Sequence, residues 1–250
     1  MARMDSLGTV DKAVDILFAL HQEPDPLGVT ALGRQLGMPK ASVHRLLASL
    51  TRRGLVERDE RGRYRPGLAL LALGLGVLER EPLCVAARSQ LEAEARALDE
   101  TVFLVALRAG RLVVLDKAEG RGFLRAAPRV GSEVPVHATA VGKLFLAHDA
   151  DFVLPEARLE RFTGQTLTSR AMLDAAVDEV RSRGFAENRD EWIAGLSVVA
   201  APIFLRGAIR GALAVAAPSP RLDELGADRV ARRARAAAAR IGAALEGGSR

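Results

Sequence analysis

The basic residues between positions 40 and 65 give the clearest indication of function in this chain, because their types and spacing suit binding to a polyanion. Eight cations and three anions lie in this stretch, so it carries a net charge of +5, equal to that of the whole chain. Arg45 and Arg52 share one face of a predicted helix with Ala41 and Ala48. Small and cationic side chains on one exposed face suit close approach to the major groove of duplex DNA. The stretch therefore predicts a DNA-binding surface.

Individual side chains on this surface are expected to take different parts in binding. We expect Ser42, His44 and Arg45, near the start of the helix, to contact bases or the sugar-phosphate backbone. The remaining expected contacts are to phosphates, and they come from Lys40, Arg52, Arg61 and Arg63. The alternative is a solvated helix and hairpin with ordinary surface charge.

Histidines and acids do not form a recognisable catalytic or metal-binding pattern. No nucleophile elbow, HExxH motif or glycine-rich phosphate loop occurs, and the four histidines lack metal-ligand spacing. We expect no catalytic residue, no metal ion and no cofactor. An enzyme of unknown class remains the alternative, because His137 lies near Thr139 and Lys143, and Asp190 adjoins Glu191. A non-specific architectural DNA-binding protein is a third possibility, favoured only if binding ignores sequence.

Two short helices and a hairpin must position the basic residues. Thr30 is the expected N-cap of the first helix, and Gly37 is expected to form the turn after it. The second helix carries an apolar stripe at Val43, Leu46, Leu47 and Leu50. Residues 55–58 and 63–65 read as two strands around a turn. This arrangement predicts a winged helix-turn-helix.

Two further N-terminal helices are expected to cover apolar surface. Residues 6–21 predict a first helix with an apolar face. Residues 68–78 predict a nearly all-apolar linker helix, too short to span a bilayer. An exposed helix of this kind would aggregate, so we expect it to associate with a second copy of the chain.

The C-terminal part changes from helical to strand periodicity. Residues 82–98 predict a helix, and residues 102–107 with 112–115 predict a hairpin. Further strands are expected at 122–126, 198–205 and 208–215, and further helices at 139–147, 174–183 and 222–245. The fold class is α+β, with an antiparallel sheet flanked by helices. We expect a DNA-binding domain at 1–67, a linker helix at 68–81 and a second domain at 82–250.

Composition narrows the cellular setting. A single cysteine, Cys84, excludes an internal disulfide, and a buried structural thiol is expected there. The N-terminus lacks the apolar core of a secretory signal. We therefore expect a cytoplasmic protein without membrane contact.

The chain resembles the IclR family of bacterial transcriptional regulators over nearly its whole length. In the N-terminal half the resemblance lies in residues 36–47 and 62–67. In the C-terminal half it lies in residues 130–143, 180–186 and 195–202, and these blocks in this order are the more specific signal.

The resemblance implies a winged helix-turn-helix joined by a linker helix to a GAF-like effector-binding domain. It implies dimers or tetramers that regulate genes of small-molecule catabolism. It also implies an effector pocket, and the matching positions here are Ala138, Thr139, Ala140, Asn188, Trp192, Val198, Val215 and Ala217. Many members carry Cys at the position of Val198 and Ser near Val215 and Ala217, so the pocket of this chain is expected to be less polar.

The expected effector follows from this lining. Thr139 and Ala140 begin a predicted helix, whose free N–H groups favour a carboxylate. Apolar walls cannot pair additional hydroxyl groups. We therefore expect an aromatic or otherwise largely apolar organic acid, and we expect the double-stranded DNA partner to be a palindromic operator.

Overall fold

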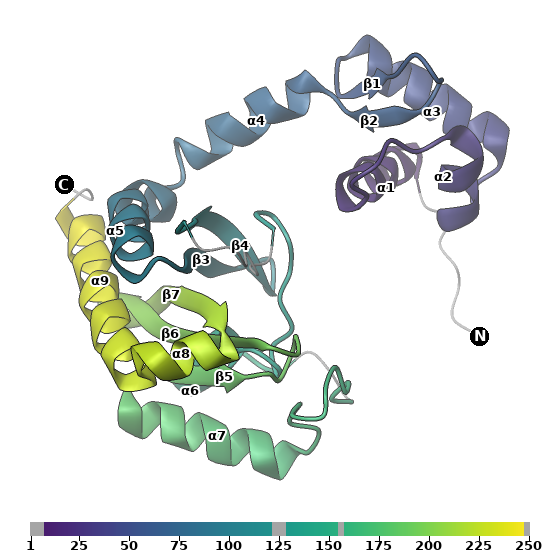
Figure 1. Cartoon of the computed structure of the whole chain (residues 1–250). Helices are drawn as coiled ribbons and strands as arrows, with labels where there is room; N and C mark the ends of the chain where they lie inside the picture. Colours follow the sequence, from purple (N-terminus) through teal and green to yellow (C-terminus); the bar gives the residue numbers. More distant parts are fainter. Residues whose placement is uncertain (1–7, 122–128, 155–157, 248–250) are drawn as a thin grey trace. The chain divides into compact units, whose positions relative to one another are not determined.

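Residues 8–121, 129–154 and 158–247 are described by the computed structural model. The chain forms two compact units, Met1–Glu79 and Arg80–Arg250, each with its own apolar core (Figure 1). No helix among the described residues is long and apolar enough to cross a membrane.

The N-terminal unit is a helix-turn-helix followed by a two-stranded wing. Its elements are α1 (Thr9–Gln22), α2 (Val29–Gln35), α3 (Lys40–Arg52), β1 (Val56–Arg58), β2 (Tyr64–Pro66) and α4 (Leu68–Leu78). Ile16 of α1, Leu32 of α2 and Leu47 of α3 are fully buried together, so the apolar sides of three helices make the core. The predicted stripe of α3 faces this core, with Leu46 partly exposed.

The wing is an antiparallel hairpin in which Glu57 pairs with Arg65. Gly62 turns the chain with a φ of 76°, a conformation that glycine adopts without strain. Leu27 exchanges backbone hydrogen bonds with Tyr64, at 2.9 and 2.7 Å, and so fastens the loop before α2 to the wing.

Several helix boundaries differ from the sequence-based prediction. Thr30 is not an N-cap, because α2 already begins at Val29 and Gly28 occupies the cap position. Pro39 is the N-cap of α3, which begins at Lys40. The first helix begins at Thr9, where the Asp11 carboxylate accepts a hydrogen bond from the N–H of Gly8 at 2.8 Å.

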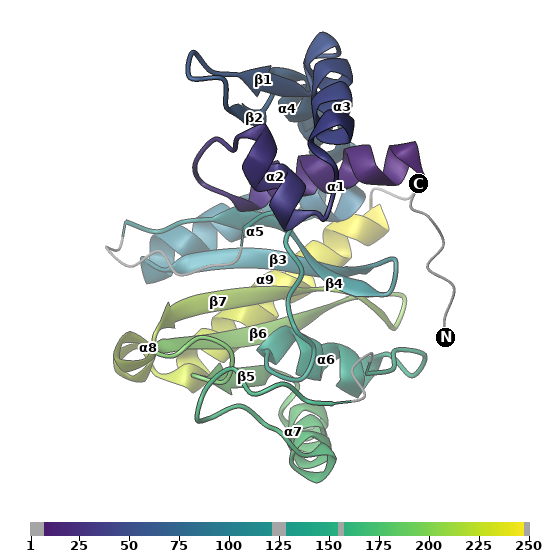
Figure 2. The same ribbon diagram turned by 90° about the vertical axis from the view of Figure 1, so that its right-hand side faces the viewer.

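The C-terminal unit is an antiparallel five-stranded sheet with the strand order β4-β3-β7-β6-β5. The strands are β3 (Thr101–Arg108), β4 (Arg111–Ala118), β5 (Ala186–Arg189), β6 (Leu196–Leu205) and β7 (Ala208–Pro218). The helices are α5 (Pro82–Leu98), α6 (Ala140–His148), α7 (Arg170–Arg183), α8 (Ser219–Leu225) and α9 (Ala227–Gly247). Helices α5 and α9 cover one face of the sheet, and α6 and α7 lie on the other side (Figure 2).

The C-terminal unit differs from the sequence-based prediction in one helix and one strand. The predicted helix 222–245 is two helices, because Gly226 interrupts it with a φ of 78°. The strand predicted at 122–126 lies outside the described residues. Strand β5 was not predicted, since its four residues are too short for a periodic signal.

Candidate DNA-binding surface and effector cavity

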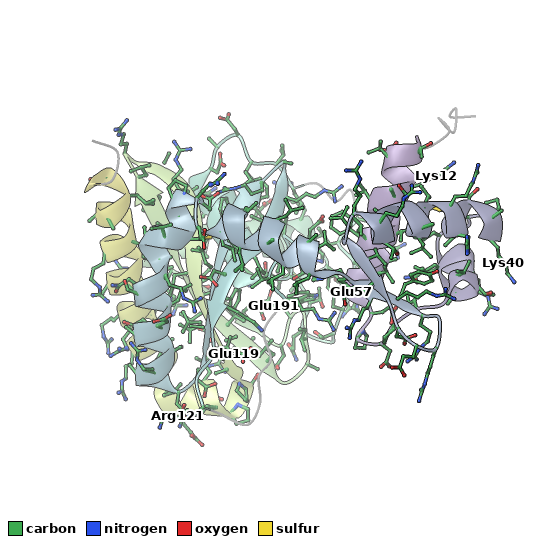
Figure 3. The ribbon with its side chains drawn as sticks, turned by 90° about the horizontal axis from the view of Figure 1, so that it is seen from above. Lys12, Lys40, Glu57, Glu119, Arg121 and Glu191 are labelled. Carbon is green, nitrogen blue, oxygen red and sulfur yellow. The ribbon has the colours of Figure 1, made fainter. Side chains whose placement is uncertain are left out.

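The exposed face of α3 carries the predicted DNA-contacting side chains. His44, Arg45 and Arg52 are exposed, and Ser42 is partly buried. Lys40 projects from the first turn of α3 (Figure 3). Because α3 buries Val43, Leu47 and Leu50, its opposite side is free for a ligand.

Four of the predicted cations have no ion-pair partner among the described residues. They are Lys40, Arg45, Arg52 and Arg61. Unpaired cations can approach phosphates without first breaking a protein contact. Arg53, which was counted in the basic stretch but not assigned a contact, is also exposed at the end of α3.

Arg63 differs from the other cations because it is held inside the wing. Its Nε donates to Oδ2 of Asp59 at 3.0 Å, and its backbone N–H donates to Oδ1 at 2.8 Å. The backbone hydrogen bond from Arg63 is the largest of the causes that lower the pKa of Asp59. Arg65 is similarly paired with Glu57 at 3.0 Å. Arg63 therefore stiffens the turn of the wing, while Arg61 at its tip remains free.

A small cavity lies between α6 and the segment that leads from β5 into β6. It has a volume of about 20 Å³. Five predicted positions line it, namely Thr139, Ala140, Asn188, Trp192 and Val198. Its other lining residues are Phe103, Val134, Val141, Ile193 and Leu196. The cavity can hold about one water molecule, so a larger ligand requires its walls to separate.

Most polar side-chain atoms at this cavity already have partners. The Thr139 hydroxyl donates to the carbonyl of Pro135 at 2.7 Å and accepts from the N–H of Gly142 at 3.1 Å. Asn188 donates through Nδ2 to the carbonyl of Ala138, and its Oδ1 accepts from the N–H of Glu191 at 3.2 Å. The N–H groups of Ala140 and Val141 have no partner among the described residues, as expected in the first turn of a helix. They are unpaired polar groups of two residues that line the cavity.

Three predicted pocket positions do not line the cavity. Ala138 is fully buried behind the wall and contributes its carbonyl to Asn188. Val215 and Ala217 lie on the opposite face of β7, because Ala214 and Ala216 pack with the α6 side of the sheet. Val215 and Ala217 therefore do not line this cavity, and their part in effector binding stays a prediction.

Of the five lining residues that the sequence did not reveal, Phe103 and Leu196 lie in strands. Phe103 of β3 pairs with Ala214 of β7, so both face α6. The alternating pattern of β3 could have suggested Phe103, but its strand partner could not be read from the sequence. Ile193 directly follows Trp192, and 41% of its surface is exposed.

A buried ion pair lies beside the cavity. Lys143 of α6 donates through Nζ to Oε1 of Glu191 at 2.5 Å and to the carbonyl of Glu187 at 3.0 Å. Only 4% of the Lys143 surface and 8% of the Glu191 surface is exposed. Burial raises the pKa of Glu191, and Lys143 opposes that effect. Glu191 lies inside the C-terminal unit (Figure 3).

His137 is committed to structural contacts. Its Nε2 is 2.8 Å from the carbonyl oxygen of Glu160, and its ring stacks on Phe162 at a centroid distance of 5.6 Å. Neither His137 nor Lys143 lines the cavity. Within the described part of the chain, no group of histidines, cysteines and acids could hold a metal ion.

A winged helix-turn-helix followed by a sheet domain with an internal cavity defines the class of DNA-binding transcriptional regulators. The IclR helix-turn-helix domain matches residues 9–60, and the C-terminal domain of bacterial IclR transcriptional regulators matches residues 75–243. The chain belongs to the IclR family of bacterial transcriptional regulators.

Named relatives agree with this assignment. The HTH-type transcriptional regulator KdgR of Escherichia coli is 33% identical over 226 residues, which cover 88% of this chain and 86% of KdgR. The regulator BhcR of Paracoccus denitrificans is 33% identical over 221 residues, covering 86% and 79% of the two chains. An IclR regulator structure from Alicyclobacillus acidocaldarius superimposes with a TM-score of 0.85 at 26% identity, covering 96% and 99%.

An IclR homolog from Microbacterium hydrocarbonoxydans, solved with 4-hydroxybenzoate, has the same fold. Its TM-score is 0.84 at 21% identity, over 96% of this chain and 100% of that one.

Proposed function

We propose that this IclR-family regulator binds a palindromic operator as a dimer, under the control of an aromatic or otherwise largely apolar acid. The observation that carries the proposal is the exposed face of α3, where Lys40, Arg45 and Arg52 have no ion-pair partner among the described residues. These cations supply binding energy from phosphates, and side chains near the helix start read base edges.

Exposed apolar helices in the N-terminal unit support self-association. Leu71 and Leu75 of α4 are 56% and 47% exposed, and no residue of α4 is buried. Helix α1 adds Val10, Val14 and Phe18, which are exposed at successive turns of one face. A second copy of the chain would cover both surfaces and give the two-fold symmetry that a palindromic operator requires. A tetramer would pair two such dimers.

The cavity supports an apolar acid as the effector. Phe103, Val198 and Leu196 supply apolar walls, and the free N–H groups of Ala140 and Val141 suit a carboxylate. The Thr139 hydroxyl is already paired at both its donor and its acceptor side, so it offers little to a hydroxylated ligand. An unmatched buried hydroxyl would cost about 1–3 kcal/mol.

We propose no catalytic role and no cofactor. The groups that suggested an enzyme, His137 and Lys143, are engaged in structural contacts outside the cavity lining. The Asp190 carboxylate accepts hydrogen bonds from Gly195 and Ser219, at 2.7 and 2.8 Å.

Gel-shift titrations at several salt concentrations test the DNA-binding part. Arg45→Ala is expected to cost about 1–3 kcal/mol and to relax sequence preference if Arg45 reads a guanine. Arg61→Ala and Arg63→Ala are both expected to weaken binding to all DNA sequences. Arg61→Ala should reduce the salt dependence of binding more than Arg63→Ala, because Arg63 already forms an ion pair with Asp59. Equal affinity of the unmodified protein for operator and random DNA would contradict the proposal.

Fluorescence of Trp192, the only tryptophan, tests the effector part. Benzoate, 4-hydroxybenzoate and aliphatic acids such as glyoxylate are titrated into the full chain. We expect benzoate to bind more tightly than glyoxylate, and Val198→Ser to narrow that difference. Thr139→Val, which removes the side-chain cap of α6, should weaken the binding of every acid. Tighter binding of glyoxylate, or no effect of either substitution, would refute this pocket.

A further inference from the structure

The effector cavity has two walls that come from different parts of the chain. One wall is the first turn of α6, with Thr139, Ala140 and Val141. The other is formed by Asn188 of β5 and by Trp192 and Ile193 in the segment after it. Because the cavity is only about 20 Å³, the distance between these walls limits what can enter.

Lys143 and Glu191 join the two walls just behind the cavity. Lys143 lies one helical turn after Ala140, and Glu191 directly precedes Trp192. The 2.5 Å contact between Nζ and Oε1 and the 3.0 Å contact to the Glu187 carbonyl hold α6 against β5 and against the residue that precedes Trp192. An opening of the cavity that moves Trp192 away from α6 must therefore stretch or rotate about this pair.

Glu191 is also fixed from its other side. Its carbonyl accepts a hydrogen bond from the Thr166 hydroxyl at 2.6 Å, and the preceding carbonyl, of Asp190, accepts one from the Thr163 hydroxyl at 2.6 Å. The residues that follow Trp192 are exposed and end at Gly195, which has a φ of 81°. The base of the segment is thus held by these hydrogen bonds, and its exposed tip is closed by the Gly195 N–H, which donates to the Asp190 carboxylate at 2.7 Å.

The ion pair does not fully satisfy its carboxylate. Oε2 of Glu191 is buried without a partner among the described residues, as is Nδ1 of the neighbouring His137. Burial raises the pKa of Glu191 even though Lys143 is in contact with it. A buried pair of this kind contributes little net stability compared with apolar residues of similar volume, but it demands one geometry. The pair therefore fixes the position of Glu191 relative to α6 more than it stabilises the fold.

We propose that Lys143 and Glu191 are the specificity-determining pair of this regulator, because their contact fixes the separation of the cavity walls and so sets the size of the acid that is admitted. The proposal rests on the effector function proposed above. Neither side chain touches the effector; both act through the position of Trp192.

The test replaces both charges at once, so that no unpaired buried charge remains. The variant Lys143→Met/Glu191→Leu keeps similar volumes and should fold. The matched control is Lys117→Met/Glu119→Leu, which removes a Lys–Glu pair with a 2.7 Å contact on β4 and the residue after it. Thermal unfolding of the single variant Lys143→Met gives the cost of leaving Glu191 unpaired.

Two readouts are taken on the full chain. First, acrylamide quenching of Trp192 without any acid should rise toward that of a free tryptophan derivative in the Lys143/Glu191 variant, and not in the control. Second, the ratio of the dissociation constants of 2-naphthoate and benzoate should fall about tenfold, since the larger acid gains most from a wider cavity. If the Lys143–Glu191 pair had a purely structural role, its replacement would weaken the binding of both acids equally and leave this ratio unchanged.

The outcomes separate the two proposals. Unchanged quenching and an unchanged ratio would overturn the role of Lys143 and Glu191. If neither acid binds the unmodified protein or the variant, the effector proposal fails, and the quenching result alone decides whether the pair positions Trp192.

Discussion

Single residues at the start of α6 decide how closely the cavity wall is packed. A Cβ atom on Gly142 would lie 1.8 Å from the carbonyl oxygen of Val136, so only glycine fits where this helix meets the segment before it. The same residue donates its N–H to the Thr139 hydroxyl. Gly142 therefore permits both the close approach and the cap that orient the free N–H groups of the wall.

Gly142→Ala is expected to destabilise the C-terminal unit by about 1–3 kcal/mol or more, because neither the helix nor the Val136 backbone can give way without moving the other. Urea unfolding followed by Trp192 fluorescence measures this loss. Gly164→Ala is the control, since a Cβ there meets no atom within 4 Å. Equal stability of the two variants would contradict the packing argument.

His148, in the last turn of α6, gives the chain a pH-dependent stability. Burial, and then the nearby charge of Arg181, lowers the pKa of His148 from 6.5. Below pH 6.5 the unfolded chain therefore binds a proton that the folded chain does not, so the folded state loses stability as the pH falls toward the lowered pKa. The slope contributed by one such group is at most about 1.4 kcal/mol per pH unit.

His148→Gln should flatten this dependence between pH about 7 and about 5, measured as the urea midpoint of the Trp192 signal. His44→Gln, at an exposed position of α3, should leave it unchanged. A wild-type slope in the His148 variant would refute the assignment.

Helix α4 is the apolar helix that packs least against the rest of its unit, since none of its residues is buried. Four of its leucines, Leu68, Leu71, Leu73 and Leu75, are exposed. Large exposed apolar patches mark surfaces of association. The double substitution Leu71→Glu/Leu75→Glu is expected to give a monomer or insoluble protein, because it places two like charges in the shared apolar surface. Sedimentation at micromolar concentration measures this.

Val85→Glu provides the comparison, since Val85 is 61% exposed on a different helix, α5. It should leave the sedimentation of the chain unchanged. A monomeric wild-type protein would remove both the role of α4 and the case for a palindromic operator.

Elements with strong local signals could be predicted from the sequence. The residue range 82–98 predicted for a helix coincides with α5, because Pro82 favours a first turn and the apolar spacing is regular. The recognition helix and the wing follow from the stripe of α3 and from turn residues. The break at Gly226 was missed because a glycine inside an alanine-rich helical pattern is compatible with either continuation or a stop.

The cavity was predictable only where its residues lie close together in the chain. Thr139 and Ala140 share one helix turn, and Asn188 and Trp192 share one segment. Val215 and Ala217, which the family resemblance suggested, face the other side of the sheet, and an offset of one residue along a strand is enough to change the face. Phe103 reaches the cavity only through the pairing of β3 with β7, which no local pattern specifies.

The whole molecule consists of two units with separate cores, and each unit contains one natural optical reporter. Tyr64, the only tyrosine, is buried in the N-terminal unit, and Trp192, the only tryptophan, is in the C-terminal unit. Separate cores unfold as separate cooperative steps, and the smaller unit buries less surface per residue. The Tyr64 signal is therefore expected to change at a lower urea concentration than the Trp192 signal.

Leu47→Ala should shift only the Tyr64 transition, because Leu47 is fully buried in the N-terminal core. Removal of this side chain should cost about 2–5 kcal/mol. Coincident transitions that move together in this variant would show that the two units unfold as one.

The lack of buried residues in α4 has a consequence for gene control. A helix of 11 residues that contains Gly74 and Gly76 is marginal on its own in water. If a second copy covers it, as proposed, its order depends on that copy, so helix formation and pairing share one equilibrium. Dilution would melt the segment that connects operator binding to the rest of the chain, and each doubling of the regulator's abundance would raise operator occupancy more than proportionally. The amount of regulator in the cell would then control operator occupancy together with the concentration of the effector acid.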